Sequence, residues 1–536
     1  VLVGGRTGRD GIHGVTFASA ELTERSEKVS RPAVQIANPI EEERLKRGIL
    51  EVRDRGLCSG ITDLGGGGLS CAAGEMAYRS GCGVHVDLDR VPLRYTDMIP
   101  WEVWISESQE RMLLSVPEEH VSEVLEVFEG EDVLATPIGS FTDDKRAKVD
   151  YRGYRVADLE LQFLFNPPKV RRVAEWREPD FHEPIFPEPE DLTGYLLRLL
   201  SAPNIASKES VIRTYDHEVQ GNTVLKPLQG RHSGPNDAAV IKPLPDSWRG
   251  VVVSCGMNPN YGKVDPYWMT ASAIDEAIRN NVSVGGRRIA LLDNFTWGNP
   301  EKPDRMGGLV RAVQACYDFA KGFGVPFVSG KDSLYNESPL GPVTPTLLIT
   351  AIGVLPDVRK VVSMEVKRPG NLIYVVGKTY PELGGSEYYK LRGFIGKTVP
   401  KVRPEAKRNM DAVTASIDAG YVKACHDPSE GGLAVAAVEM AFAGGLGVEL
   451  HLKNVPRSHV KRNDYLLFSE SNSRFLVEVP ERRRGDFEAL MKRVPHACVG
   501  RVKDGNRLSI YGLNGELAVD ADLADLRRAW KGTFGG

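Results

Sequence analysis

The stretch Asp63-Leu64-Gly65-Gly66-Gly67-Gly68-Leu69 decides the fold, because a version of it returns near the other end of the chain. At an offset of 364 residues, 63–92 aligns with 427–456, and 15 of the 30 paired positions are identical. Unrelated sequences would give about two identities over this length. The second copy reads Asp427-Pro428-Ser429-Glu430-Gly431-Gly432-Leu433 at the corresponding place. The chain therefore contains one fold twice.

Each copy has the pattern of a strand, an aspartate, a glycine-rich turn and a helix. In the second copy the apolar residues of the expected helix recur at intervals of three and four, at Leu433, Ala436, Ala437, Met440 and Ala441, which is helical spacing. Between the copies the sequence is unlike either of them and alternates irregularly between expected helices (268–280, 307–323) and strands (251–255, 288–292, 347–354). Such irregular alternation favours α+β domains with mixed sheets over a doubly wound sheet.

The repeat also sets the predicted domain organisation. A proline-rich stretch at 169–190 is expected to be a linker, because proline resists both helix and sheet. We predict one domain at 1–168, a different domain at 191–357 and a second copy of the first at 358–536. If the ancestral unit was the unlike domain followed by the repeated one, a further domain would precede Val1 in the natural protein. An unduplicated three-domain protein is the alternative.

Composition narrows the class of protein. The chain has 536 residues and a formal net charge of −4, so it offers no general cationic field to nucleic acid or an anionic membrane. Its longest apolar runs are about half of what a membrane span needs. The seven cysteines form no CxxC pair, so no disulfide framework or zinc site is indicated. We therefore expect a cytoplasmic protein with no nucleic-acid or membrane partner.

Asp63 and the glycines after it are candidates for phosphate chemistry. Backbone N–H groups at such a helix start hold phosphate, and a nearby carboxylate holds its magnesium. The structural alternative is that the glycines permit a tight turn while the aspartate caps the helix. In the second copy Pro428, Ser429 and Glu430 replace part of the turn, so Asp427 is predicted to mark a structural or degenerate site.

Three further segments carry suitable residues. The loop at 4–14 holds five glycines and two arginines, a composition suited to wrapping an anion, although it could be a flexible hairpin. The segments 293–298 and 330–336 each follow an apolar run, and we expect acid-bearing turns at strand ends there. His217 has the composition of a general acid or base, but a lone histidine is more often structural. The chain has no GxxxxGK[ST] motif, so the usual P-loop for ATP is absent.

Taken in order along the chain, the motifs resemble those of the phosphoribosylformylglycinamidine synthase (PurL) family. The residues that carry the resemblance are 5–14, 63–69, Glu107-Ser108-Gln109, 215–221, 234–239, Asp275 to Ala277 with Asn280, 293–298 and 329–337. That family is built from two fused AIR-synthetase (PurM)-like units in the order A1-B1-A2-B2. The resemblance implies that this chain is B1-A2-B2 and lacks the A1 domain.

The resemblance implies an ATP-dependent ligase of purine biosynthesis. Formylglycinamide ribonucleotide, ATP and glutamine-derived ammonia would give formylglycinamidine ribonucleotide through a phosphorylated amide. The ribonucleotide would contact Gln35, Glu107, Ser108, Gln109 and Ser333. ATP would contact Asp293, Gly330 and Lys331, and Asp63 would hold Mg²⁺.

Two departures from the family bear on this assignment. Many family members have asparagine, a metal ligand, where this chain has Lys331. A protonated lysine cannot ligate magnesium, so Lys331 could contact phosphate directly. The family's catalytic histidine lies in the A1 domain, so no catalytic residue can be named here.

No glutaminase domain is evident in the sequence. In the small form of the family, separate PurQ and PurS subunits deliver ammonia, so these are the expected partners. A second hypothesis, of a different class, is a nonenzymatic fragment or pseudoenzyme that binds nucleotide or partner subunits. A third, a selenophosphate or AIR synthetase, is weakened by the tandem arrangement, because those proteins are single units that dimerise.

Overall fold

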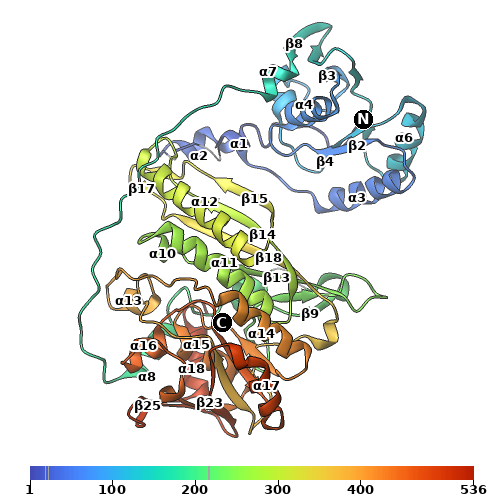
Figure 1. The fold of residues 1–536 in the computed structure, drawn as a ribbon. Coiled ribbons are helices and arrows are strands. Elements are labelled where there is room, and N and C mark those ends of the chain that lie inside the picture. Colours follow the sequence, from blue (N-terminus) through green and yellow to red (C-terminus); the bar gives the residue numbers. More distant parts are fainter. Residues whose placement is uncertain (18–19, 22, 215–217, 536) are drawn as a thin grey trace. The chain divides into compact units, whose positions relative to one another are not determined.

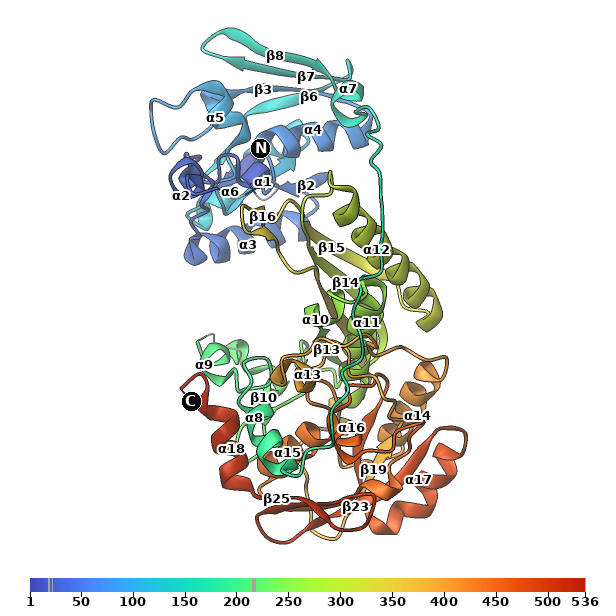
Figure 2. The ribbon, with the colours of Figure 1, turned by 90° about the vertical axis from the view of Figure 1, so that its left-hand side faces the viewer.

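The computed structural model describes residues 1–17, 20–21, 23–214 and 218–535. The chain divides into two compact units, an amino-terminal unit of Val1–Arg171 with Leu334–Gly341, and a larger unit of Arg172–Ser333 with Pro342–Gly536. Figures 1 and 2 show the helices and strands of both units.

The amino-terminal unit is built on two four-stranded sheets, in the orders β2-β4-β1-β5 and β6-β3-β7-β8. The strands of the first sheet are β1 (Leu2–Gly4), β2 (Gly60–Asp63), β4 (Arg111–Ser115) and β5 (Ala135–Thr136). Those of the second are β3 (Gly83–Asp87), β6 (Gly139–Thr142), β7 (Arg146–Tyr151) and β8 (Tyr154–Glu160). The pair β3/β7 is parallel and the other pairs are antiparallel, so this unit contains a mixed sheet.

The helices of this unit bury their apolar sides against the sheets. Helix α4 (Gly68–Ser80) contributes Leu69, Ala72, Ala73 and Ala77 to a core shared with Val84 and Val86 of β3. Helices α3 (Pro39–Asp54) and α6 (Val121–Gly130) form a second core with residues of β1 and β4. Shorter helices are α1 (Gly14–Phe17), α2 (Ser26–Val29), α5 (Pro100–Ile105) and α7 (Leu161–Phe165).

The larger unit contains a six-stranded mixed sheet in the order β15-β14-β18-β13-β12-β9. Its strands are β9 (Thr223–Leu225), β12 (Ala239–Ile241), β13 (Gly250–Gly256), β14 (Arg287–Thr296), β15 (Phe327–Ser333) and β18 (Thr346–Leu355). Helices α11 (Pro266–Ser283) and α12 (Pro303–Phe323) pack on each other, and α11 also packs on β13 and β18. Because α11 lies between other elements, 15 of its 18 residues are buried, including Asp275 and Arg279.

The same unit contains a seven-stranded sheet in the order β20-β22-β19-β23-β21-β24-β25. Its strands are β19 (Leu372–Val376), β20 (Ala424–His426), β21 (Gly447–His451), β22 (Phe475–Val479), β23 (His496–Lys503), β24 (Arg507–Tyr511) and β25 (Leu517–Asp522). Helix α15 (Gly432–Gly444) is buried on every side, as expected of a helix that is apolar all round. It packs against α8 (Leu192–Leu200), α16 (Asn463–Phe468) and α18 (Leu523–Gly532). The unit also contains α13 (Glu387–Leu391), α14 (Ala406–Asp418) and α17 (Arg484–Leu490).

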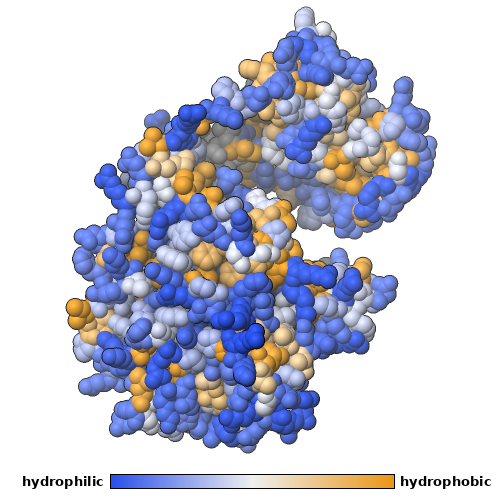
Figure 3. Space-filling view, in the orientation of Figure 1, coloured by the Kyte–Doolittle hydropathy of each residue, from blue (hydrophilic) through white to orange (hydrophobic). Residues whose placement is uncertain are grey.

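The structure confirms the predicted α+β class and the repeat. The succession β2, α4, β3 in the first copy recurs as β20, α15, β21 in the second. The helices and strands expected between the copies appear as α11, α12, β13, β14 and β18. Residues 167–189 contain neither helix nor strand. The surface in Figure 3 is largely hydrophilic with interspersed apolar residues.

Candidate functional site

The glycine turn of the first copy places Asp63 at the end of β2 and at the start of α4. Gly67 and Gly68 have φ of 75° and 58°, and a Cβ on Gly68 would lie 2.1 Å from the carbonyl oxygen of Ser106. Only glycine allows this close approach. Asp63 is exposed, and its Oδ2 accepts a hydrogen bond of 2.8 Å from the Gly65 N–H. The carboxylate therefore stabilises the turn before the helix and is accessible from outside.

The loop from Ser106 to Arg111 is held rigid by a buried guanidinium. Arg111 donates to the carbonyl oxygens of Ser106 and Ser108, at 2.6 and 2.8 Å, and to Thr7 Oγ1 at 2.8 Å. Burial lowers its pKa to about 10. Three bonds from one planar group fix both this loop and the start of the 4–14 loop.

The 4–14 loop is an ordered structure. Ser108 Oγ accepts from the Gly8 N–H at 2.9 Å and donates to Asp10 Oδ1 at 2.9 Å. Arg9 is bound by Asp97 and Glu102. Side chains from outside the loop thus hold it at several points, which favours a structured loop over a flexible hairpin. The hydroxyl of Ser108 is one of these points.

Glu107 connects three segments of the unit. Its side chain is 3% exposed, and Oε1 accepts from the backbone N–H groups of Gly67 and Val15 at 3.1 and 3.2 Å. Its Oε2 accepts from Gln35 Nε2 at 3.3 Å. Two predicted substrate residues, Glu107 and Gln35, thus contact each other, and Glu107 also anchors the glycine turn.

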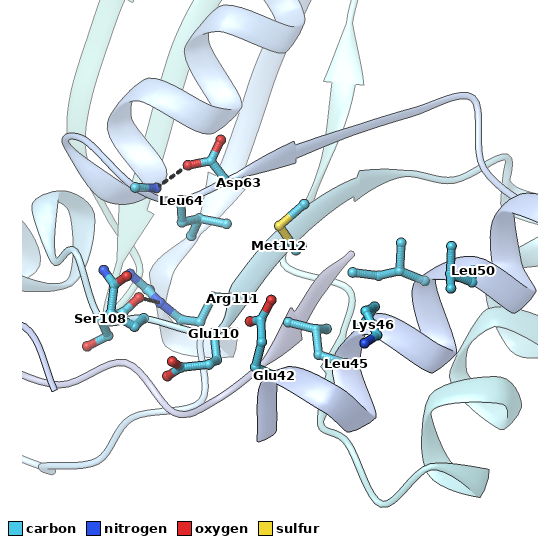
Figure 4. Close-up of a pocket in the computed structure, with 13 residues that line it drawn as sticks. Glu42, Leu45, Lys46, Leu50, Asp63, Leu64, Ser108, Glu110, Arg111 and Met112 are labelled. Atoms are coloured by element: carbon cyan, nitrogen blue, oxygen red, sulfur yellow. Dashed lines mark hydrogen bonds between the residues drawn. The ribbon is translucent and has the colours of Figure 1, made fainter. Parts of the chain in front are cut away.

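Asp63, Ser108 and Gln109 line one cavity of about 260 Å³, together with Glu42 and Lys46 of α3. Figure 4 shows the Asp63 carboxylate accepting from the backbone beyond Leu64, while Glu110 and Glu42 lie on the other side of the opening. Three predicted residues from two separate segments are therefore brought together.

Gln109 also lines a neighbouring cavity of about 710 Å³, with Arg6 and Arg94 among its other residues. Arg94 is held at 3.2 Å by the buried Asp10. Sequence reasoning missed Arg94, and its only signal was its position two residues after the repeated Val91-Pro92 pair. These arginines supply positive charge beside the predicted substrate residues.

A second group of predicted residues lies on the six-stranded sheet of the larger unit. In the parallel pair β14/β15, Asp293 lies opposite Gly330, Asn294 opposite Lys331 and Thr296 opposite Ser333. The acid-bearing turns expected at 293–298 and 330–336 are in part wrong, because residues 293–296 and 330–333 belong to the strands themselves. Extended backbone and ladder hydrogen bonds continue through the polar residues.

Gly330 lies directly against the Asp293 side chain. A Cβ on residue 330 would lie 1.8 Å from Asp293 Oδ1, so the carboxylate occupies the space that a side chain would take. Burial, and secondarily the charge of Asp332, raise the pKa of Asp293. Lys331 is exposed beside this pair. His217 lies outside the described residues.

The second copy repeats the scaffold of the first. Arg474 donates to the carbonyl oxygens of Ser469 and Ser471 and to Thr379 Oγ1, just as Arg111 does. Glu470 Oε1 accepts from the N–H groups of Gly431 and Glu387 at 3.0 Å. Asp427, however, is only 8% exposed, whereas its counterpart Asp63 is exposed. This contrast is consistent with the predicted structural role of Asp427.

The family models that match are those of AIR synthase related proteins. The C-terminal domain model matches residues 1–152 and 368–512, and the N-terminal domain model matches residues 235–355. The fold and the duplicated site therefore define a tandem AIR synthase-related protein with the domain order C-terminal, N-terminal, C-terminal type.

Similar proteins specify the family. A Thermoplasma volcanium protein named phosphoribosylformylglycinamidine synthase subunit PurL is 38% identical over 99% of this chain and 69% of its own length. The protein of the same name from Thermococcus gammatolerans is 42% identical, over 98% of this chain and 72% of its own length. A solved structure of Thermotoga maritima PurL complexed with FGAR has a TM-score of 0.67 and 26% identity, over 94% of this chain and 71% of that one.

The chain belongs to the PurL family of phosphoribosylformylglycinamidine synthase subunits. Enzymes of this family are ATP-dependent synthetases of purine biosynthesis that amidate formylglycinamide ribonucleotide, and the ligase activity inferred from the motifs is confirmed. Among the described residues, no helix has the length and apolar character needed to cross a membrane.

Proposed function

We propose that the amino-terminal unit binds the ribonucleotide substrate through the residues around Asp63 and Gln109. The observation that carries this proposal is the convergence of Asp63, Ser108 and Gln109 on one cavity whose walls are fixed by Arg111 and Glu107. Arg6 and Arg94 on the adjoining cavity supply the charge that a ribose phosphate needs. Glu107 sets the position of the glycine turn and of Val15, and it contacts Gln35.

ATP is assigned to the edge formed by β14 and β15. Asp293, Gly330 and Lys331 lie on paired strands, so their spacing is fixed by the ladder. Ser333, on the same ladder, is proposed to contact the ribonucleotide. The exposed ammonium of Lys331 is suited to a phosphate oxygen, because it is a compact point charge with three donors. This contact replaces the metal ligand that asparagine supplies in other members of the family.

Mg²⁺ is proposed at Asp63. The residue fits the ion, because Mg²⁺ prefers carboxylate oxygens and keeps several waters, and the Asp63 carboxylate is exposed beside the glycine turn. When bound, the ion would neutralise charge on the transferred phosphoryl group.

The reaction requires positioning more than covalent chemistry by the protein. ATP transfers its terminal phosphoryl group to the amide oxygen of the substrate, and ammonia then displaces that oxygen as phosphate. The rigid loops around Asp63 would hold the ribonucleotide in one orientation, and cationic side chains would stabilise the charge that develops on the phosphoryl group. The relatives are named as subunits, and we propose that PurQ and PurS subunits supply the ammonia.

The test is ADP formation from ATP, with formylglycinamide ribonucleotide and ammonium chloride. It uses this chain and the same chain extended at its amino terminus by a domain of the type matched at 235–355. ADP that appears only with the ribonucleotide supports the proposal, and Asp63→Asn should abolish it while Asp143→Asn, an exposed carboxylate of the same unit, should not. ATP binding that never responds to the ribonucleotide would favour the nonenzymatic alternative.

The partner assignment needs its own measurement. Purified PurQ and PurS homologues are mixed with the chain, and glutamine replaces ammonium chloride as the nitrogen source. Glutamine-dependent ADP formation and co-elution of the three proteins in size-exclusion chromatography are the expected results. Activity with ammonia but none with glutamine and both subunits would contradict the assignment.

A further inference from the structure

A buried acidic cluster lies in the larger unit at the position that corresponds to the Asp63 site. A cavity of about 350 Å³ is lined by five carboxylates, from Asp237, Glu276, Asp427, Glu430 and Glu439. One possible ligand atom from each of Asp237, His426 and Asp427 lies within 4.8 Å of the other two. This spacing would suit a metal ion. The repeat alone would therefore suggest a second cation or phosphate site.

Arg279 forms a buried ion pair with Asp427. The guanidinium, on α11, is 2% exposed, and its Nε and Nη2 lie 3.2 and 3.1 Å from Asp427 Oδ2. It also bonds Asp275, and it donates to Ser429 Oγ at 2.9 Å. Burial opposes the charge on Arg279, but Asp275 and Asp427 raise its pKa above the usual range. The guanidinium is therefore permanently charged.

His426 neutralises a second carboxylate. Its Nδ1 lies 3.1 Å from both carboxylate oxygens of Asp237, and its Nε2 lies 3.0 Å from Glu439 Oε2. Burial lowers the pKa of His426, but the facing carboxylates Asp237 and Glu439 raise it above its usual value, which favours the charged ring. A ring nitrogen that donates to a carboxylate has no lone pair for a metal. The Asp427 N–H also donates to Asp237 at 2.9 Å.

The remaining contacts of the cluster join residues 191–357 to residues 358–536. Tyr261 Oη donates to Glu470 Oε2 at 2.6 Å, and Asn258 Nδ2 donates to Glu430 at 3.2 Å. Asp275 accepts from the Ser473 N–H at 2.9 Å. In the first copy the Oε2 of Glu107 instead accepts from Gln35. The second copy has thus exchanged contacts within its own domain for contacts between two domains.

We propose that Arg279 and His426 are built-in counter-cations that close the second copy's site, which makes it a permanent polar joint between residues 191–357 and 358–536. The joint holds α11, which packs on the six-stranded sheet, against the second copy. Within the part of the chain that the structure describes, the metal site proposed at Asp63 is then the copy left open to a cation. This inference goes beyond the proposed function and does not depend on catalysis.

The alternative occupant is a divalent cation bound in addition to these side chains. Two amide oxygens of the cluster, Oδ1 of Asn258 and of Asn280, have no hydrogen-bond partner, and Asn280 lines the cavity. The experiment must therefore separate a closed joint from a metal site.

The first measurement is Mn²⁺ binding in the absence of nucleotide, detected by electron paramagnetic resonance. We expect the Asp63→Asn variant to lose all of the Mn²⁺ that the wild-type protein binds. Mn²⁺ that persists in Asp63→Asn and disappears in Asp427→Asn would overturn the proposal. If Asp63→Asn changes nothing because no Mn²⁺ binds at all, the magnesium assignment at Asp63 fails while the closed joint stands.

The second measurement is the thermal unfolding midpoint of Arg279→Met. The matched control is Arg287→Met, because Arg287 also joins the two domains, through Asp418 at 2.6 Å, but is 30% exposed. We expect Arg279→Met to lower the midpoint by at least about 5 °C, since it leaves buried carboxylates unpaired. Arg287→Met should lower it by less than about 2 °C, because exposed pairs contribute little.

Adding Mn²⁺ then tests whether a metal ion can take the place of the Arg279 guanidinium beside Asp427. It should raise the midpoint of Arg279→Met, and adding Asp427→Asn to that variant should remove the effect. Arg279→Met as stable as Arg287→Met would overturn the proposal. If Arg279→Met does not fold, Arg279→Lys keeps the charge, and the Mn²⁺ comparison of wild type with Asp63→Asn still decides the question.

Discussion

Replacing Glu107 with alanine removes the acceptor that connects three segments of the amino-terminal unit. Gly67 and Val15 each lose a charge-assisted hydrogen bond from the backbone. Bonds to charged groups contribute roughly 1.5–3 kcal/mol each. Val15 is 54% exposed, so water replaces most of its loss, whereas Gly67 is half-buried. We expect Glu107→Ala to lower the free energy of unfolding by about 2–4 kcal/mol.

The assay is urea unfolding together with hydrogen exchange at the amides of residues 11–17 and 63–72. Exchange should accelerate at Val15 and Gly67 and stay unchanged in the seven-stranded sheet. Glu107→Gln keeps an oxygen for the two N–H groups but turns an amide nitrogen toward Gln35, so about half of the effect is expected. Glu110→Ala is the matched control, because Glu110 lines the same cavity.

The result that refutes this reasoning is specific. If Glu107→Ala unfolds at the same urea concentration as Glu110→Ala and exchanges normally, while affinity for the ribonucleotide falls, then Glu107 acts on substrate and not on the scaffold. Loss of both stability and affinity supports a positioning role.

The other predictions concern ATP and pH. Gly330→Ala should displace the Asp293 carboxylate, whose Oδ1 lies 1.8 Å from the new Cβ, and raise the KM for ATP about tenfold or more, with little change in urea unfolding; an unchanged KM would contradict the assignment. Lys331→Ala should reduce kcat/KM for ATP by about 10- to 100-fold. Lys331→Asn should recover activity as the Mg²⁺ concentration is raised. Equal kcat/KM values for the wild type and both variants would show that Lys331 is not part of the ATP site. Burial raises the pKa of Glu470 from 4.5 to about 8, so the folded state holds this proton longer than the unfolded state, and stability should fall as pH rises from about 4.5 to 8. Glu470→Gln should flatten this slope in urea unfolding at a series of pH values, and an unaltered slope would show that other groups cause it.

The fold class and the family were predicted from the repeat and from the resemblance of the motifs. The repeat and the motifs are both patterns of nearby residues, which can be read directly in the sequence. The glycine turn after Asp63 was predictable, since two consecutive residues with positive φ need glycine. The strand character of 293–296 and 330–333 was not predictable, because their polar residues resemble a turn and only pairing with neighbouring strands keeps them extended. The role of Arg94 was hidden for a similar reason, as its partner Asp10 is 84 residues away.

The sequence by itself determined that one fold occurs twice, that a different domain lies between the copies, and which residues could handle phosphate. Only the tertiary structure decided which of the two copies is open. Asp63 and Asp427 occupy the same place in the motif, but Arg279, 148 residues from Asp427, packs against the second one alone. Burial and ion pairing depend on residues that the rest of the fold places beside a site, and these residues cannot be identified from the motif itself.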